Sequence, residues 1–191
     1  MIFSHVLSEA VLASTGFGVF WHYYQRMARY NRILWGFFLL TISLAAVAGL
    51  LWFAGYQAIG QLYHALITLA GSLGIVSVVT AVWALLNNLT LGVFSFAVTL
   101  VLGLFLFILL RLPPISDFAP VVTALSILVV MLMAVYGLMR RNPRSVWIIF
   151  AVMLLGLSTK APSFYRYIHP TDFYHYTVAL SLLCFGKAAE V

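Results

Sequence analysis

Long apolar stretches, separated by short breaks of polar residues, glycine or proline, run along almost the whole chain. A helix that crosses a bilayer needs roughly 20 consecutive apolar residues. No Asp, Glu, Lys or Arg occurs between Arg32 and Arg111, so that stretch alone has room for about three such helices. We therefore predict an all-α fold, a polytopic membrane protein with a seven-transmembrane-helix bundle in a single domain, 1–191. The seven segments run approximately over Ser4–Tyr24, Ile33–Phe53, Gln57–Leu86, Leu89–Leu110, Pro120–Arg140, Pro143–Thr159 and Pro170–Gly186.

The composition excludes a soluble domain, because only 7% of the residues are charged and 64% are hydrophobic. Soluble domains carry about 25% charged residues. The net charge of +6 does not indicate a nucleic-acid partner, since the basic residues stand at the ends of the segments rather than in one patch. The first apolar segment lacks a basic region before it and a small-residue cleavage site, so we expect it to remain as a helix. The expected partners are membrane lipids.

The basic residues also predict an orientation. Seven spans place the two ends of the chain on opposite sides of the membrane. Basic residues concentrate on the cytoplasmic side of membrane proteins, so the N-terminus is predicted to lie outside and the C-terminus in the cytoplasm. The side that holds the C-terminus would carry seven of the ten basic residues: Arg26, Arg29, Arg32, Arg140, Arg141, Arg144 and Lys187.

Ionisable residues inside membrane spans are costly and usually face the interior of the bundle, so they are the first functional candidates. Glu9 lies in the first segment, His64 in the third, and Asp172 and His175 in the seventh. These odd-numbered segments run in the same direction. The four residues therefore lie at similar depth, within about 10 Å of the outer side at 1.5 Å rise per residue.

Asp172 and His175 are three residues apart, which brings both side chains to one face of a helix. Together with His64 from another helix they would form a three-ligand set of two imidazoles and a carboxylate, with the fourth position open. Catalytic zinc sites have this form, in which bound water becomes acidic enough to attack a carbonyl group near neutral pH. We predict that these three residues hold Zn²⁺ and that Glu9 or Ser14 handles protons or orients the substrate.

A plain structural interpretation stays open beside this one. Asp172 near a helix start can cap the free backbone N–H groups there. His64 and His175 can form hydrogen bonds between helices without any metal. Glu9 can face water at the outer rim of the bundle. His5, His22 and His169 are expected near the membrane surface and are assigned no role.

Three short stretches carry a resemblance to a known superfamily: Glu9-Ala-Val-Leu-Ala-Ser14, Gly60-Gln-Leu-Tyr-His64 and Thr171-Asp172-Phe-Tyr-His175. The pattern is similar to the superfamily that joins alkaline ceramidases, progestin/adipoQ receptors and small bacterial seven-helix proteins. The resemblance implies zinc ligation by His64 and His175, with Asp172 as third ligand in place of the second histidine of the family's last helix. It also implies hydrolysis of a lipid amide or ester bond and a place in the bacterial inner (cell) membrane.

Two other functions remain open from the sequence. The chain can be a non-catalytic structural or accessory subunit of a membrane protein complex, which suits its short loops. It can also be a small transporter or proton conductor, but the polar residues gather near one side and the intervening segments offer no continuous path.

Overall fold

The computed structural model describes residues 2–190, and the described residues form helices joined by loops and turns, with no strand. This confirms the predicted all-α class. Helices lie over each of the seven apolar segments. Their bounds are α1 (Ile2–Val19), which continues into the π-helical turn η1 (Phe20–Tyr24); α2 (Arg29–Phe53); a third rod made of η2 (Gln57–Ile59), α3 (Gly60–Leu69), the π-helical turn η3 (Ala70–Gly74) and α4 (Ile75–Leu86); α5 (Val93–Leu110); the short α6 (Pro113–Ser116); α7 (Ala119–Met139); α8 (Arg144–Ser158); η4 (Ala161–Phe164); and α9 (Pro170–Glu190).

Five of the described helical rods are long and apolar enough to cross a membrane. They cover Phe3–Tyr24, Arg29–Phe53, Gln57–Leu86, Val93–Leu110 and Ala119–Met139. The remaining two long helices differ from these. Helix α8 is apolar but has only 15 residues, and α9 carries acidic and basic residues in its end turns. The seven-span count therefore stays a prediction.

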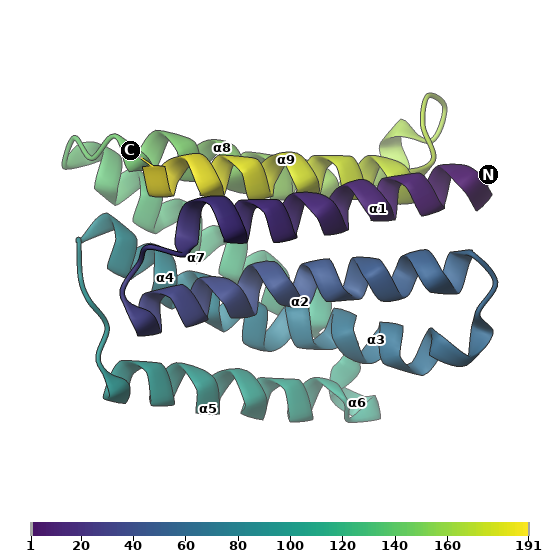
Figure 1. Ribbon diagram of the computed structural model, residues 1–191, viewed down its shortest axis with the longest axis horizontal. Coiled ribbons are helices and arrows are strands. Elements are labelled where there is room, and N and C mark those ends of the chain that lie inside the picture. Colours follow the sequence, from purple (N-terminus) through teal and green to yellow (C-terminus); the bar gives the residue numbers. More distant parts are fainter. Residues whose placement is uncertain (1, 191) are drawn as a thin grey trace.

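Six rods form a closed ring, and α5 lies outside it. Helix α1 packs against α2 on one side and α9 on the other; the ring continues from α2 through the α3–α4 rod, α7 and α8 back to α9. Figure 1 shows α1, α8 and α9 on one side of the bundle and α5 at the opposite edge. Helix α5 packs against the third rod, where Gly103 allows the closest approach: a Cβ atom there would lie 2.9 Å from the Cα atom of Leu73.

One predicted boundary shifts for a local reason. The fourth segment was expected to begin at Leu89, whereas α5 begins at Val93. The side chain of Asn31 holds the intervening residues in a loop: its amide N–H donates to the Leu89 carbonyl (2.8 Å), and its amide oxygen accepts from the Leu91 N–H (2.8 Å). Polar side chains of this kind offer the backbone an alternative to helical hydrogen bonds.

The outer faces of the bundle are apolar. On α5, Phe94, Val101, Phe105 and Ile108 are each more than half exposed. A soluble monomer rarely exposes contiguous apolar surface of this extent. These faces suit contact with the hydrocarbon of a membrane, where helices keep every backbone polar group bonded internally.

Candidate functional site

A buried polar network joins the beginning of α1 to the beginning of α9. The carboxylate of Asp172 accepts hydrogen bonds from Ser4 Oγ (2.5 Å), His5 Nδ1 (2.8 Å) and Ser8 Oγ (2.8 Å). Ser4 and Ser8 are four residues apart on α1 and therefore share the face that meets α9. Asp172 is only 2% exposed and lies in the first turn of its helix, where the helix dipole favours a negative charge. These contacts satisfy an acidic group that would otherwise be costly to bury.

The network continues inward from Ser8. Its hydroxyl lies 3.0 Å from His175 Nδ1, and His175 Nε2 lies 3.4 Å from Glu9 Oε1. A serine hydroxyl has one hydrogen to donate. When it donates to Asp172, it accepts from His175 Nδ1–H, and the lone pair of His175 Nε2 then points toward Glu9. A hydrogen bond between these two atoms would therefore require a protonated Glu9 or a doubly protonated imidazole.

Glu9 is the exceptional residue of this group. It is 2% exposed, and its Oε1 has no hydrogen-bond partner among the described residues, since the 3.4 Å contact with His175 lacks hydrogen-bond geometry. Buried polar atoms are nearly always hydrogen-bonded, so an unpartnered one calls for an explanation. Glu9 fits between the helices because position 49 is glycine: a Cβ atom on Gly49 would lie 2.8 Å from Glu9 Cδ and 2.9 Å from Tyr63 Cε2.

Glu9 and His175 form part of the wall of a cavity of about 390 Å³ inside the ring of helices. Ligand pockets commonly have volumes of about 300–1,000 Å³. The remaining wall is mostly hydrocarbon, supplied by all six rods of the ring and by no residue of α5. It includes Leu12, Phe38, Ile42, Ala46, Ile67, Ile75, Val78, Ile127, Val130, Val152, Leu155, Val178 and Phe185.

Aromatic side chains close the end of the cavity that lies far from Glu9. Phe185 follows His175 by ten residues on α9, which corresponds to about 15 Å along the helix. Its ring packs edge-on against Phe38 (5.4 Å between centroids). Behind them the ring of Tyr24 stacks on Trp35, and the Tyr24 hydroxyl donates to the carbonyl of Phe185 (2.7 Å). The cavity is therefore polar at one end and sealed by aromatic rings at the other.

The structure brings together three of the five residues predicted from the sequence, namely Glu9, Asp172 and His175. His64 does not join them: it is exposed, and its ring packs against Trp52 (5.9 Å between centroids) and Tyr63 (5.5 Å). The predicted set of His64, Asp172 and His175 is thus not among the groups of metal-ligand atoms that lie close together in the described chain. The donors present do not fit zinc at that set.

The reason lies in the rotation of α3 about its axis. Tyr63 and Ile67, which are four residues apart, face the cavity, so the adjacent His64 points elsewhere even though its depth is suitable. Ser14 lies apart from the network. It is exposed, and its hydroxyl donates to the carbonyl groups of Ala10 (2.8 Å) and Val11 (3.1 Å) within its own helix.

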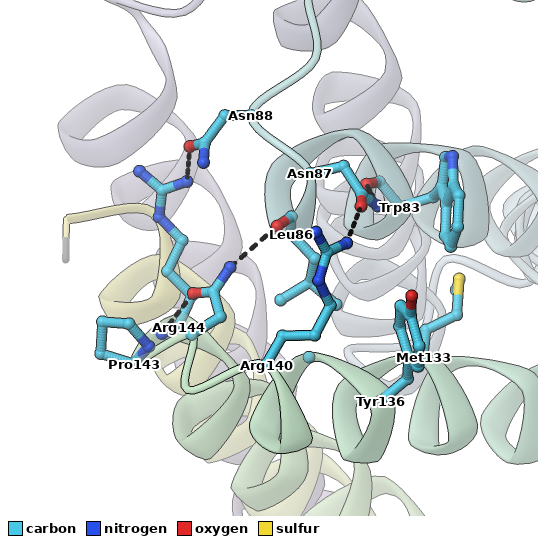
Figure 2. A pocket seen from close by; sticks show the side chains of 11 residues that line it. Trp83, Leu86, Asn87, Asn88, Met133, Tyr136, Arg140, Pro143 and Arg144 are labelled. Carbon is cyan, nitrogen blue, oxygen red and sulfur yellow. Dashed lines mark hydrogen bonds between the residues drawn. The ribbon is translucent and has the colours of Figure 1, made fainter.

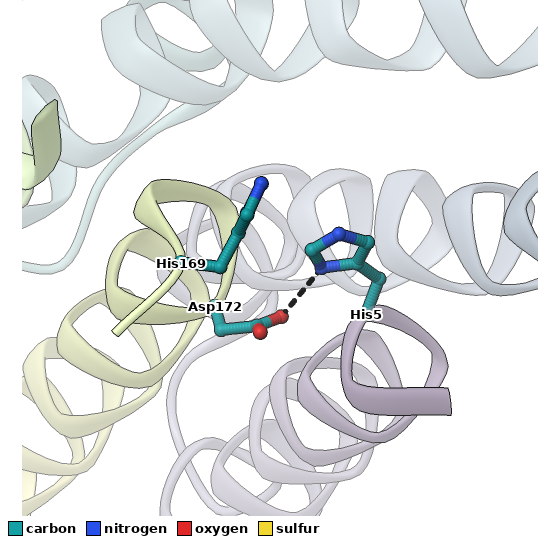
Figure 3. Close-up of side chains that lie close together, drawn as sticks. All are labelled: His5, His169 and Asp172. Atoms are coloured by element: carbon teal, nitrogen blue, oxygen red, sulfur yellow. Dashed lines mark hydrogen bonds and ion pairs between the residues drawn. The ribbon is translucent and has the colours of Figure 1, made fainter. Parts of the chain in front are cut away.

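Sequence reasoning missed three residues of the network, Ser4, His5 and Ser8, and the neighbouring His169. Ligand atoms of His5, His169 and Asp172 all lie within 4.8 Å of one another (Figure 3). The two histidines were assigned to the membrane surface because each lies near the end of a segment. The available signal was the spacing of Ser4, His5 and Ser8, which places three polar side chains on neighbouring positions of one helix end.

A second hollow, of about 450 Å³, lies at the opposite end of the bundle, where the end of α4 meets the α7–α8 turn (Figure 2). Its arginines are engaged within the protein. Arg140 donates to Asn87 Oδ1 (3.3 Å), and Arg144 donates to the carbonyl of Leu85 (2.9 Å) and to Asn88 Oδ1 (2.5 Å). These bonds fasten the α4–α5 loop to the α7–α8 turn, so we assign this hollow a structural role.

No curated protein sequence and no solved structure matches the chain. One family model does match, and it covers residues 4–190, which include every residue of the α1–α9 network and of the cavity wall. The chain accordingly belongs to the family described as "Family of unknown function (DUF6962)".

Proposed function

We propose that this protein is a membrane hydrolase that holds the apolar chain of a lipid in its cavity and cleaves an ester or amide bond at the lipid's polar end. One observation carries the proposal: a cavity with hydrocarbon walls has the buried pair Glu9 and His175 at one end and an aromatic seal at the other. An amphipathic molecule with a single chain has the matching distribution of polar and apolar parts.

The catalytic pair can perform hydrolysis with its own protons. His175 Nε2 accepts a proton from a water molecule, and the water oxygen bonds to the carbonyl carbon. The protonated Glu9 then donates its proton to the departing alcohol or amine as the C–O bond of the ester or the C–N bond of the amide breaks. The proton then returns from His175 Nε2 to Glu9 Oε1, which lie 3.4 Å apart, once the two side chains turn into hydrogen-bond geometry. Ser8 and Asp172 orient the imidazole, as a third group orients the base in other hydrolases. No step runs through zinc at the set expected from the sequence.

Ser8 is a weaker candidate for the nucleophile, although its hydroxyl also contacts His175. It is fully buried, its proton is engaged by Asp172, and it does not form part of the cavity wall. Attack by water at the Glu9 end of the cavity is therefore the route that the geometry favours.

We further propose seven spans, an outside N-terminus and a place in the bacterial inner membrane. Two features support this topology: α1 and α9 begin at the same end of the bundle, and the first and last described residues lie at opposite ends (Figure 1). Helix α8 is about 22 Å long and would have to thin the bilayer locally, because the hydrocarbon core is about 30 Å thick.

The experiment uses the full chain purified in mild detergent. Native mass spectrometry detects bound lipid, and fluorogenic esters and amides of C8–C16 acyl chains report hydrolysis. The substitutions Glu9→Gln and His175→Gln should lower hydrolysis at least about 100-fold, as expected when a general acid or base is lost. Glu190→Gln and His64→Gln, which change exposed residues of the same types, serve as controls.

Undiminished hydrolysis in both Glu9→Gln and His175→Gln would contradict the assignment of the pair. A stoichiometric protein partner that co-purifies with a lipid-free chain would instead support the accessory role that the sequence left open.

A further inference from the structure

His5, His169 and Asp172 form a compact group at the end of the bundle, outside the cavity wall. In Figure 3, His5 extends from α1 toward Asp172 and His169, which lie where α9 begins. His5 Nδ1 is 2.8 Å from Asp172 Oδ1, and the centroids of the two imidazole rings are 4.3 Å apart. The chain thus offers two imidazole nitrogens and a carboxylate oxygen within one small volume, from α1, from α9 and from the residue that precedes α9.

These donors have the chemistry of a transition-metal site. Imidazole and carboxylate groups are the ligands that Zn²⁺ takes in three-ligand sites, at about 2.0–2.2 Å, with a fourth position left to water. A tetrahedral ion at that distance requires its ligand atoms to be about 3.3 Å apart. The distance between His5 Nδ1 and Asp172 Oδ1 must therefore grow by about half an ångström. The largest distance between two of the three ligand atoms, up to 4.8 Å, must shrink by about 1.5 Å. Rotation of the side chains can supply both movements.

Neighbouring side chains contact the three residues, as the residues around a metal site contact and orient the metal ligands. Ser4 and Ser8 donate to the two oxygens of Asp172, and Phe53 packs against the ring of His5 (5.3 Å between centroids). The only side-chain hydrogen bond of His169 within the described chain is a long one, from the Thr171 N–H to Nδ1 (3.3 Å). Its ring can therefore rotate toward a metal ion at little cost.

Access favours this position over the buried end of the network. The side chain of His5 is 12% exposed, whereas that of Asp172 is 3% exposed, so the group opens toward the end of the bundle through its histidines. An ion can reach it from water without crossing the helices, and a water molecule can fill the fourth position.

We propose that His5, His169 and Asp172 bind one divalent transition-metal ion, with Zn²⁺ as the ion their donor set suits best. This site differs in two of its three ligands from the set that the sequence predicted. The catalytic pair Glu9 and His175 lies further along the same network, beyond Ser8. The two proposals therefore share Asp172, which contacts Ser8 and would also bind the ion.

The test measures metal binding without any substrate. Full-length protein is stripped of metal in detergent and titrated with Co²⁺, whose visible absorption becomes intense in four-coordinate sites, and Zn²⁺ is then added in competition. We expect one ion per chain. His5→Gln and His169→Gln should each weaken binding at least tenfold, and Asp172→Asn should do the same. His22→Gln and His64→Gln, which change exposed histidines, should leave the affinity unchanged.

Several results would overturn the proposal. Failure to bind Co²⁺ or Zn²⁺ at 100 µM would show that the group is only a hydrogen-bonded link between α1 and α9. Loss of binding in His64→Gln equal to that in His169→Gln would place the ion elsewhere. His169 precedes α9, so its substitution tests the site even when the His5 and Asp172 variants fold poorly. Glu9→Gln should abolish hydrolysis and still bind the ion, which separates this proposal from the previous one.

Discussion

Substitution of Gly49 by alanine tests whether close packing of α1 on α2 positions the catalytic pair. The added Cβ atom would lie 2.8 Å from Glu9 Cδ and 2.9 Å from Tyr63 Cε2, whereas ordinary contacts begin at 3.4 Å. The Oε1 atom of Glu9 would lie closer still to the added Cβ atom. The Glu9 carboxyl group must therefore retreat by about 1 Å, and the Tyr63 ring by about half an ångström. Misplacement of a catalytic group by about 1 Å can lower a rate about 100-fold, so we expect Gly49→Ala to lower lipid hydrolysis about 10- to 100-fold.

The effect on stability should be smaller than the effect on function. Inserting a methyl group into a packed interior costs about 1–3 kcal/mol, and replacing a helical glycine by alanine returns up to about 1 kcal/mol. Thermal unfolding in detergent measures the balance. Gly71→Ala is the matched control, because it changes a glycine of the cavity wall whose added Cβ atom meets nothing within 4 Å. Equal hydrolysis and equal melting temperature in the two variants would refute the packing argument.

Two further predictions concern the cavity and its aromatic seal. Val130→Phe should fill the cavity and reduce the bound lipid detected by native mass spectrometry at least tenfold. The neighbouring Val129→Phe, at an exposed position, should have no effect. If both variants retain lipid equally, the proposed lipid site is wrong. Tyr24→Phe removes the hydrogen bond to the Phe185 carbonyl and leaves a buried acceptor unpaired, so it should destabilise the protein by about 1–3 kcal/mol in detergent unfolding. Exposed Tyr167 is the control position, and a Tyr24→Phe variant as stable as Tyr167→Phe would contradict the role of this bond.

The helices were predictable because the hydrophobic pattern is long and has few interruptions. A stretch without charges between Arg32 and Arg111 leaves little choice but membrane helices, and proline and basic residues mark the ends of the later ones. The start of α5 was not predictable in the same way. It depends on Asn31, which lies far from Leu89 in the sequence and contacts it only in the folded bundle.

The site was predictable in depth but not in direction. Residue position along a helix gives depth directly, and Glu9, Asp172 and His175 do meet. Which face of α3 meets the cavity depends on how the rods pack, and this packing turns Tyr63 inward in place of His64. Ser8 was missed because a serine within a membrane helix usually bonds to its own backbone, as Ser14 does here. Ser8 also contacts its own helix, at the His5 carbonyl (3.1 Å), in addition to its bond to Asp172.

The polar network connects the first and the last of the long helices, which has a consequence for biogenesis. Because synthesis runs from α1 to α9, Ser8 and Glu9 are made well before their partners on α9. Insertion of α9 brings Asp172 and His175 to them in a single late step. Assembly of the polar network thus coincides with completion of the fold, and a chain that ends before its last helix lacks the Asp172 and His175 contacts of Ser8.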